Sequence, residues 1–417
     1  MARATPVRRS RVASVLPPLA ALLVLLTLGG CSAPSSAQPG GGGEAPAAAT
    51  DAATGTTKAS PSPSPSPVDP DVAAAERALA RLDARARAAQ LLVVGVPLDD
   101  LARGDALLTE TPYGGVFLAG RSQAAAADVG AVTTRWTDAA RQAGQPAPWV
   151  AADQEGGAVQ TFTGPGFADL PTARSQGQQD PAAVRELARG IGASLRTAGV
   201  TLDLAPVADV VPAGTARSNE PIGRHGRQYG ATAAEVNDDA AAVIAGLGEA
   251  GVVATVKHFP GLGRVTGNTD TSADVRDTTT TADDADVALF GELAALPQRP
   301  FVMTSSAVYE QIDPSAPAVF SPAVVTDLLR DRLGVDGVVI SDDLGRAKAV
   351  TAVPVAERAT RFVEAGGTLV LTVDAAVAPT MLSALTDRAA ADPAFAARVD
   401  EAALVALVAK SRAGLLP

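Results

Sequence analysis

Short apolar runs alternate with longer, alanine-rich stretches along most of this chain, from about residue 71 onward. Runs of this length, rich in β-branched residues and bounded by turn residues, are typical of buried strands, and the stretches between them have helical periodicity. Strands that alternate with helices predict parallel β-α-β units, and eight of them predict a (β/α)8 TIM barrel. We place the predicted strands at residues 91–96, 115–119, 149–153, 201–207, 252–258, 301–305, 337–342 and 368–373.

Four of the intervening stretches are clear amphipathic helices, at residues 124–143, 182–198, 232–250 and 322–333. An open, doubly wound α/β sheet is the alternative fold that this alternation permits. Such a sheet commonly carries Gly-x-Gly-x-x-Gly after its first strand, and no such motif follows the first predicted strand here. We therefore predict a single catalytic barrel domain over residues 71–417.

The N-terminus has the composition of an export signal. Four arginines in the first eleven residues precede an apolar stretch at residues 19–28, which is too short to span a membrane as a mature helix. Small residues then precede Cys31, the only cysteine in the chain. This order resembles a bacterial lipobox, so we expect a signal peptide over residues 1–30 and lipidation of Cys31. The sequence leaves open whether export follows the general or the twin-arginine route.

Residues 31–70 form a segment rich in Gly, Ala, Ser, Thr and Pro that cannot bury an apolar core. The Pro-Ser repeat at residues 61–67 favours an extended chain. We expect a disordered linker that tethers the folded domain to the outer face of the cytoplasmic membrane, in the cell envelope. The lipid anchor would be the only contact with the membrane.

The charge balance excludes some classes of partner. Acidic residues outnumber basic ones by 45 to 34, which gives a net charge of −11. Nucleic-acid binding would require clustered Lys and Arg, so we predict no nucleic-acid partner. One Cys and two His residues provide no set of metal ligands, and we predict no metal and no cofactor. We expect the protein to be a monomer.

Polar residues gather where the predicted strands end. The third strand ends in Asp-Gln-Glu-Gly-Gly (153–157), the fourth runs through Leu-Ala-Pro-Val-Ala-Asp (204–209), the fifth ends in Lys-His-Phe-Pro-Gly (257–261) and the seventh in Ser-Asp-Asp-Leu (341–344). In an α/β barrel the loops after the strands build the active site. Carboxylates beside a Lys and a His, without a metal motif, indicate carboxylate-based glycoside hydrolysis.

Together and in this order, the four motifs resemble glycoside hydrolase family 3, in its single-domain β-N-acetylhexosaminidase branch, over roughly residues 75–380. The resemblance implies a retaining exo-glycosidase that forms a covalent glycosyl-enzyme. It assigns Asp342 as the nucleophile, with Asp343 as the local competitor. It implies that the sugar is bound by Asp153, Arg227, Lys257 and His258.

The loop after the fifth strand departs from the family pattern. The best-known members that the chain resembles carry there a His that acts as general acid/base and an Asp that orients it, and this chain has Asp270 and Asn268 instead. A carboxyl serves equally well when burial or a nearby carboxylate raises its pKa, so Asp270 is the candidate acid/base. Its negative charge should also repel phosphate, which favours hydrolysis over phosphorolysis.

The leading prediction is a retaining exo-β-N-acetylglucosaminidase that removes terminal β-linked N-acetylglucosamine from peptidoglycan fragments or chitooligosaccharides. One alternative is a β-glucosidase-type exo-glycosidase of the same family, and another is a catalytically weak sugar-binding lipoprotein. For three further carboxyl groups we expect structural roles. Asp203 should be structural, Glu155 should support the turn at residues 156–157, and Asp209 should brace the loop after the fourth strand.

Overall fold

The computed structural model describes residues 69–417. The predicted signal peptide (1–30), the lipidation site Cys31 and all but the last two residues of the predicted linker (31–70) lie outside the described residues. The first helix, α1 (Pro70–Ala80), starts at the linker's last residue, with the Asp69 side chain accepting a hydrogen bond at its N-terminus. Within residues 69–417 no helix combines the length and the apolar character needed to cross a membrane.

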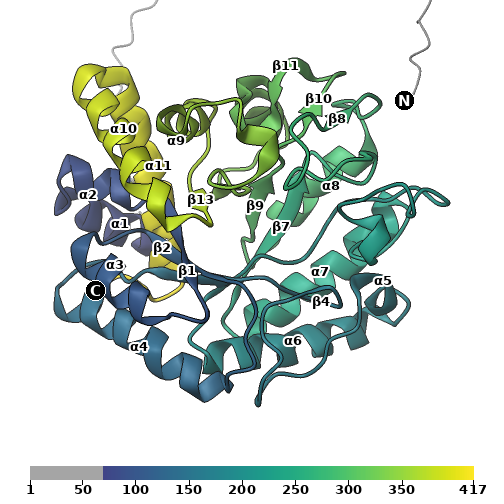
Figure 1. Ribbon diagram of the computed structural model, residues 1–417, viewed down its shortest axis with the longest axis horizontal. Helices are drawn as coiled ribbons and strands as arrows, with labels where there is room; N and C mark the ends of the chain where they lie inside the picture. The colour runs from purple at the N-terminus through teal and green to yellow at the C-terminus, as the bar shows by residue number, and fades with distance from the viewer. Residues whose placement is uncertain (1–68) are drawn as a thin grey trace, which may run out of the picture. The chain divides into compact units, whose positions relative to one another are not determined.

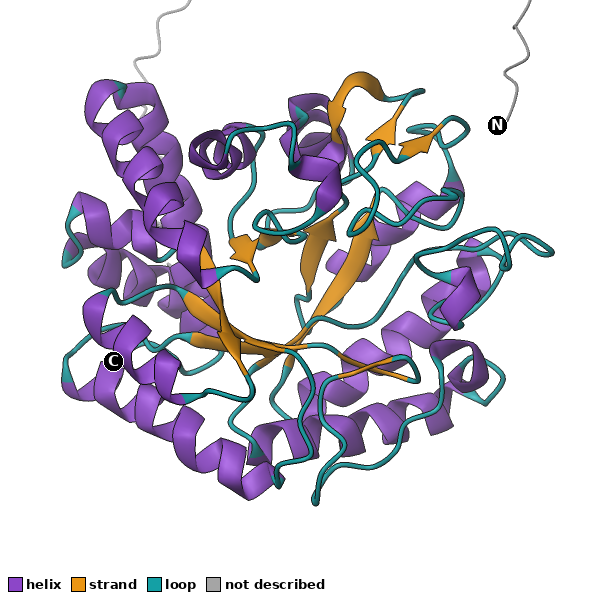
Figure 2. Ribbon diagram, viewed as in Figure 1, coloured by secondary structure: helices purple, strands orange, loops and turns teal. Residues whose placement is uncertain are grey.

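Eight parallel strands form the centre of the domain (Figure 2). Their order is β12-β9-β7-β6-β3-β2-β1-β13, and the ends of the sheet meet where Ile340 pairs with Leu369 and the Ser341 N–H donates to the Leu369 carbonyl at 2.9 Å. The predicted TIM barrel is therefore confirmed. The strands are β1 (Leu92–Pro97), β2 (Gly115–Ala119), β3 (Trp149–Ala152), β6 (Leu202–Asp203), β7 (Val253–Phe259), β9 (Phe301–Thr304), β12 (Val339–Ser341) and β13 (Val370–Thr372).

Each of the eight strands overlaps a predicted run, but β6 is much shorter than the predicted 201–207. Pro206 lies inside that run and has no N–H to donate to a neighbouring strand. Regular pairing with β7 ends at Asp203, and irregular main-chain contacts follow, which include a hydrogen bond from the Thr255 N–H to the Ala205 carbonyl at 2.8 Å and a bridge between Val207 and Lys257. The loop that supplies Arg227 to the site begins beyond Ala208, whose N–H donates to the Lys257 carbonyl at 2.6 Å.

Helices surround the barrel (Figure 1). All four predicted helices are confirmed to within two residues, as α4, α6, α7 and a π-helical segment at Ala323–Arg332. The α7 N-terminus carries a capping box in which the side chains of Thr232 and Glu235 bond to each other's backbone N–H. The helices are α2 (Ala84–Ala89), α3 (Ala102–Glu110), α4 (Ala126–Gln142), α5 (Ala173–Gln176), α6 (Pro181–Thr197), α7 (Ala233–Glu249), α8 (Ala285–Ala294), α9 (Val355–Glu364), α10 (Ala378–Ala391) and α11 (Pro393–Arg412).

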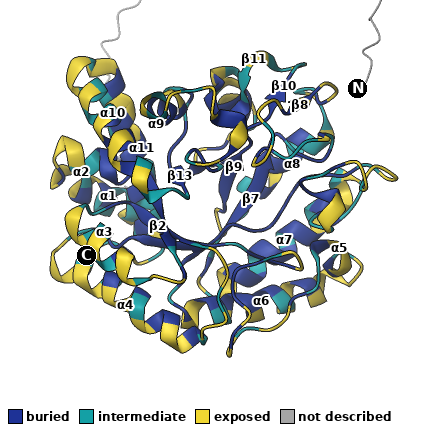
Figure 3. Cartoon of the chain, viewed as in Figure 1, coloured by how far each residue is buried: buried dark blue, intermediate teal, exposed yellow. Residues whose placement is uncertain are grey.

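The side chains of the barrel strands point alternately into two apolar layers. Figure 3 shows the strands almost entirely buried. One layer fills the barrel and includes Trp149 and Phe301, whose rings meet edge to face at 5.2 Å. The other layer, which includes Val150 and Val256, packs under the helices. Because side chains alternate along a strand, Lys257 follows the inward direction while Val256 faces the helices. A charged group thus projects from β7 into the upper end of the barrel.

Short strands order the loops at this end. The loop after β3 contains the hairpin of β4 (Gln154–Gly156) and β5 (Val159–Gln160). A three-stranded sheet joins the loops after β7 and β9. Its strands are β8 (Arg276–Asp277), β10 (Val308–Tyr309) and β11 (Asp313–Pro317).

Candidate active site

A pocket of about 370 Å³ opens where the barrel strands end, within the range of about 300–1,000 Å³ typical of small-ligand sites. Its walls come from the strands and loops of β2, β3, β6, β7, β9, β12 and β13. The structure thus brings together every predicted site residue that it describes. These lining residues are Asp153, Arg227, Lys257, His258, Asp270 and Asp342.

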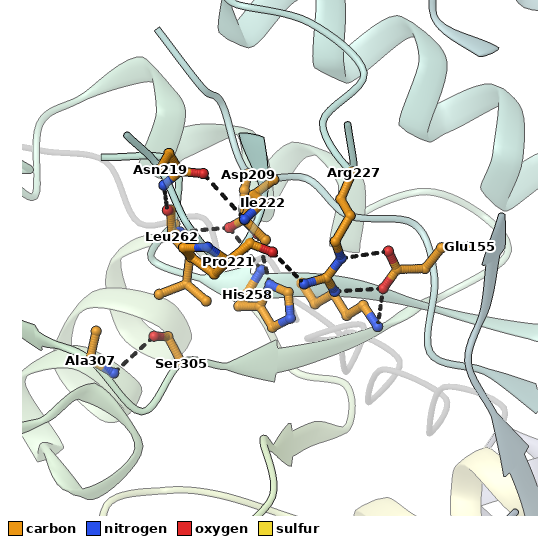
Figure 4. Close-up of polar contacts among 12 residues, drawn as sticks. Glu155, Asp209, Asn219, Pro221, Ile222, Arg227, His258, Leu262, Ser305 and Ala307 are labelled. Atoms are coloured by element: carbon orange, nitrogen blue, oxygen red, sulfur yellow. Dashed lines mark hydrogen bonds and ion pairs between the residues drawn. The ribbon is translucent and has the colours of Figure 1, made fainter. Parts of the chain in front are cut away.

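A network of four charged side chains forms one wall of the pocket. The Lys257 ammonium lies 2.7 Å from both the Asp153 carboxylate and the Glu155 carboxylate. Arg227 donates two parallel hydrogen bonds to Glu155, from Nε at 2.8 Å and from the terminal nitrogen at 2.7 Å, as Figure 4 shows. Two positive and two negative charges therefore balance, and each cation is held in a fixed direction.

Glu155 is the most enclosed member of this network, with 3% of its side chain exposed. Burial alone would raise its pKa, but the charges of Arg227 and Lys257 outweigh burial and lower the pKa to about 2. Burial would likewise lower the pKa of Lys257, yet Asp153 and Glu155 raise it above its usual value. Both groups stay ionised at neutral pH. The prediction that Glu155 supports the turn at residues 156–157 was wrong for its carboxylate, which contacts Arg227 and Lys257 instead.

Asp209 fixes the orientation of His258. Its Oδ2 lies 2.7 Å from His258 Nδ1, and its Oδ1 accepts the backbone N–H groups of His258 and Leu262 at 3.0 and 2.7 Å. Asp209 is fully buried, and both of its oxygens accept hydrogen bonds. The ring hydrogen of His258 is therefore assigned to Nδ1, and Nε2 is left for a ligand. The prediction that Asp209 braces the loop after the fourth strand was wrong, because its side-chain hydrogen bonds go to the end of β7 and to the loop after β7.

Asn219 was missed by the sequence interpretation. Its side-chain nitrogen donates to the carbonyls of Leu262 and Val265 at 2.7 and 2.8 Å. Its oxygen accepts the N–H groups of Ile222 and Gly223 at 3.2 and 2.6 Å, and Figure 4 shows the contacts with Leu262 and Ile222. It thereby joins the loop after β6 to the loop after β7. No local motif marks this residue, because all four partners are backbone groups and two of them are more than 40 residues away.

Asp270 lies farther along the same loop and is held by main-chain contacts. The Lys348 N–H donates to the Asp270 carbonyl at 3.2 Å, and the Ala349 N–H donates to the Thr269 carbonyl at 3.0 Å. The Asn268 side chain accepts the Asp270 N–H at 2.9 Å. The loop of the candidate acid/base is thus attached to the segment that follows the candidate nucleophile, and Asn268 shapes the turn.

The surroundings of Asp270 suit a proton donor. Asp270 is exposed at the pocket mouth as a whole residue, but the surrounding protein removes part of the water from around its carboxyl. This partial desolvation is the largest cause that raises the pKa of Asp270 to about 6, and the negative charge of Asp342 is the second. Smaller effects come from His258 and Arg227, which lower the pKa, and from Asp343, which raises it.

The two adjacent carboxylates after β12 have different environments. Asp343 accepts three backbone N–H groups, from Gly345 at 2.8 Å, Arg346 at 2.9 Å and Val373 at 2.9 Å. Asp342 accepts only the Asp343 N–H, at 2.8 Å through Oδ1, and its Oδ2 has no protein donor among the described residues. The geometry therefore makes Asp343 a structural residue and leaves Asp342 available to a ligand.

Within residues 69–417, no three or more His, Cys, Asp or Glu side chains are grouped so that they could hold a metal ion. The ionisable groups of the pocket are carboxylates, two basic side chains held by carboxylates, an oriented His and one further arginine, Arg346. A TIM barrel with such a pocket, and with two carboxyl groups in different environments, has the groups that glycoside hydrolysis requires.

The particular family follows from comparison with known proteins. Residues 84–405 match the model described as "Glycosyl hydrolase family 3 N terminal domain", and the chain belongs to that family. The resemblance predicted from the four strand-end motifs is confirmed.

Relatives with assigned names agree with this placement. A β-hexosaminidase of Bordetella avium is 36% identical over 304 residues, which cover 69% of this chain and 83% of that protein. The β-hexosaminidase LpqI of Mycobacterium tuberculosis is 34% identical over 323 residues, covering 73% and 77%. The crystal structure of a β-N-acetylhexosaminidase from Beutenbergia cavernae superposes with a TM-score of 0.76 at 47% identity, covering 79% of this chain and 99% of that one.

Replacing Glu155 by Gln should lower kcat/KM by about 10- to 100-fold, the usual scale for residues that orient the ligands of a site. The substitution leaves Arg227 with a neutral partner, and the uncompensated positive charge should also lower the pKa of Asp270. Because the candidate acid/base must be protonated when the first step begins, the alkaline limb of the pH–rate profile should move to lower pH.

The matched control is Glu155→Asp, which keeps the charge and shortens the side chain. It should reduce kcat/KM while leaving the alkaline limb in place. Steady-state kinetics with an aryl N-acetyl-β-glucosaminide between pH 4 and 9 measure both effects. A Glu155→Gln variant with wild-type kcat/KM and an unshifted profile would contradict the role assigned to this charge.

Proposed function

We propose that this glycoside hydrolase is a retaining exo-β-N-acetylglucosaminidase that acts through a covalent glycosyl-enzyme. The observation that carries the proposal is the pairing of Asp342 with Asp270 across one pocket. Retaining enzymes need one ionised carboxylate as nucleophile and one protonated carboxyl as acid. Asp342 Oδ2 accepts no hydrogen bond from residues 69–417, and burial together with the Asp342 charge raises the pKa of Asp270 to about 6.

In the first step the Asp342 carboxylate attacks the anomeric carbon, while Asp270 donates its proton to the departing glycosidic oxygen. In the second step the Asp270 carboxylate takes a proton from water, which attacks the same carbon and releases Asp342. Asp153, Lys257 and Arg227 present charged groups to the sugar hydroxyls, and His258 presents Nε2. The same carboxyl serves as acid and then as base, as microscopic reversibility requires.

The sugar is proposed from the relatives, whose names are β-hexosaminidase and β-N-acetylhexosaminidase. A β-glucosidase of the same family would use the same two carboxylates, so relative kcat/KM on 4-nitrophenyl N-acetyl-β-glucosaminide and β-glucoside separates the two specificities. A sugar-binding protein without turnover would bind N-acetylglucosamine and hydrolyse neither substrate.

Replacing Asp342 by Gly should reduce hydrolysis of the 4-nitrophenyl substrate by several orders of magnitude, because the covalent step is lost. Azide should restore turnover by entering the vacated face, and the product should be the α-glycosyl azide, identified by NMR. Asp336→Ala, at an exposed carboxylate outside the pocket, is the control and should keep wild-type kinetics. Full activity in Asp342→Gly, or a β-azide product, would refute the assignment of the nucleophile.

Replacing Asp270 by Ala should have an effect that depends on the leaving group. Hydrolysis of unactivated chitobiose should fall by about 10²- to 10⁴-fold, because it needs a proton donor, whereas 4-nitrophenolate leaves with little assistance. The loss of rate above the Asp270 pKa of about 6 should disappear in the variant. Added azide should restore turnover of the aryl substrate by the variant and yield the β-glycosyl azide. Equal losses of rate on both substrates would show that Asp270 is not the acid.

We also propose that the chain is exported and anchored through a lipid on Cys31, on the strength of the first 31 residues alone. Cys31→Ala should move the protein from the membrane fraction to the soluble fraction and abolish labelling by an alkynyl fatty acid, since the thiol carries the lipid. Ser32→Ala is the matched control. Labelling of Cys31→Ala, or a soluble and unlabelled wild type, would contradict the anchor.

A further inference from the structure

Four basic side chains line the pocket, and one of them differs from the other three. Lys257 and Arg227 are paired with carboxylates of the network, and His258 is paired with Asp209. Arg346 donates no side-chain hydrogen bond to any residue that the structure describes. Its nearest carboxylate is Asp374, with Nε and Oδ2 4.0 Å apart, and 66% of the Arg346 side chain is exposed. A guanidinium with five free donors therefore lies at the wall of the pocket.

The backbone of Arg346 is nevertheless firmly placed. Its N–H donates to Asp343 Oδ2 at 2.9 Å, while Asp343 Oδ1 accepts the N–H groups of Gly345 and Val373 at 2.8 and 2.9 Å. One buried carboxylate thus ties the loop after β12 to the loop after β13. Arg346 is held in this way four residues beyond Asp342.

The barrel order fixes the direction in which a substrate lies. The groups that bind the sugar belong to β3, β6, β7 and their loops, whereas the nucleophile follows β12. A terminal sugar with its hydroxyls toward the charged network must turn its anomeric carbon toward Asp342. The leaving group departs on the face opposite Asp342, beside the proton donor Asp270. Backbone hydrogen bonds attach Asp270 and Thr269 to Lys348 and Ala349, so the leaving group lies near the segment after β12 that carries Arg346.

We propose that Arg346 forms a subsite for the leaving group and selects substrates in which that group carries a carboxylate. The inference rests on the proposed function and concerns its substrate class. Peptidoglycan fragments carry a lactyl carboxylate on the sugar that follows N-acetylglucosamine, and chitooligosaccharides carry none. A guanidinium matches a carboxylate in shape and charge, so Arg346 favours peptidoglycan fragments. Asp374 competes for the same guanidinium.

The test compares two substrates that differ in one charge. These are N-acetylglucosaminyl-β-1,4-N-acetylmuramic acid and its lactyl methyl ester, with kcat/KM measured for each. The wild type should have the higher kcat/KM on the acid. Arg346→Gln should lower the ratio of kcat/KM on the acid to kcat/KM on the ester by about five- to tenfold, which is the effect expected when a charged hydrogen bond that solvent exposure weakens is lost. Asp374→Asn should raise the ratio, because the competing carboxylate is gone.

Lys348→Ala is the matched control, since this exposed cation lies on the same loop but does not line the pocket. It should keep the wild-type ratio. An unchanged ratio in Arg346→Gln, an equal fall in Lys348→Ala or a lower ratio in Asp374→Asn would overturn the subsite. A wild type that cleaves 4-nitrophenyl N-acetyl-β-glucosaminide but treats acid and ester alike refutes this inference alone. A wild type that does not cleave the aryl substrate refutes the proposed function first.

Discussion

The buried carboxylate of Glu155 holds Arg227 and Lys257 in place at the top of the barrel, and the rest of the pocket is arranged around these ion pairs. Removing one partner of a buried ion pair costs about 3–5 kcal/mol, because the other charge is left without compensation. The four charges sum to zero, so two cations and two carboxylates can line a small cavity together. Asp153 has the most exposed side chain of the four, at 27%, so its carboxylate is within reach of a ligand.

Around this network the loops are tied to one another rather than only to their own strands. Asn219 joins the loops after β6 and β7, main-chain contacts at Asp270 join those after β7 and β12, and Asp343 joins those after β12 and β13. Two of these connections join the loops of neighbouring strands, and the third passes over β9 to join the loops after β7 and β12. The site is thus preorganised by a series of contacts between loops, and little conformational entropy is left to be lost when a substrate binds.

The sequence predicted the barrel and the position of the pocket because both follow from local patterns. Apolar runs mark strands, and polar residues at their ends converge wherever parallel strands close a barrel. The sequence did not predict the partners of these residues. Glu155 meets Arg227 across 72 positions and Asp209 meets His258 across 49, and such contacts depend on how the loops fold over the barrel. The early end of β6 could have been predicted, since Pro206 was visible in the run.

The attachment of Asp270 uses backbone groups only, from Thr269 and Asp270 to Lys348 and Ala349. Almost any residue except proline supplies the same N–H and carbonyl groups, so the attachment is indifferent to which side chains occupy these positions. The position of residue 270 is therefore set separately from the chemical nature of its side chain. In evolutionary terms, imidazole and carboxyl can replace each other at position 270 without rebuilding the loop that presents them.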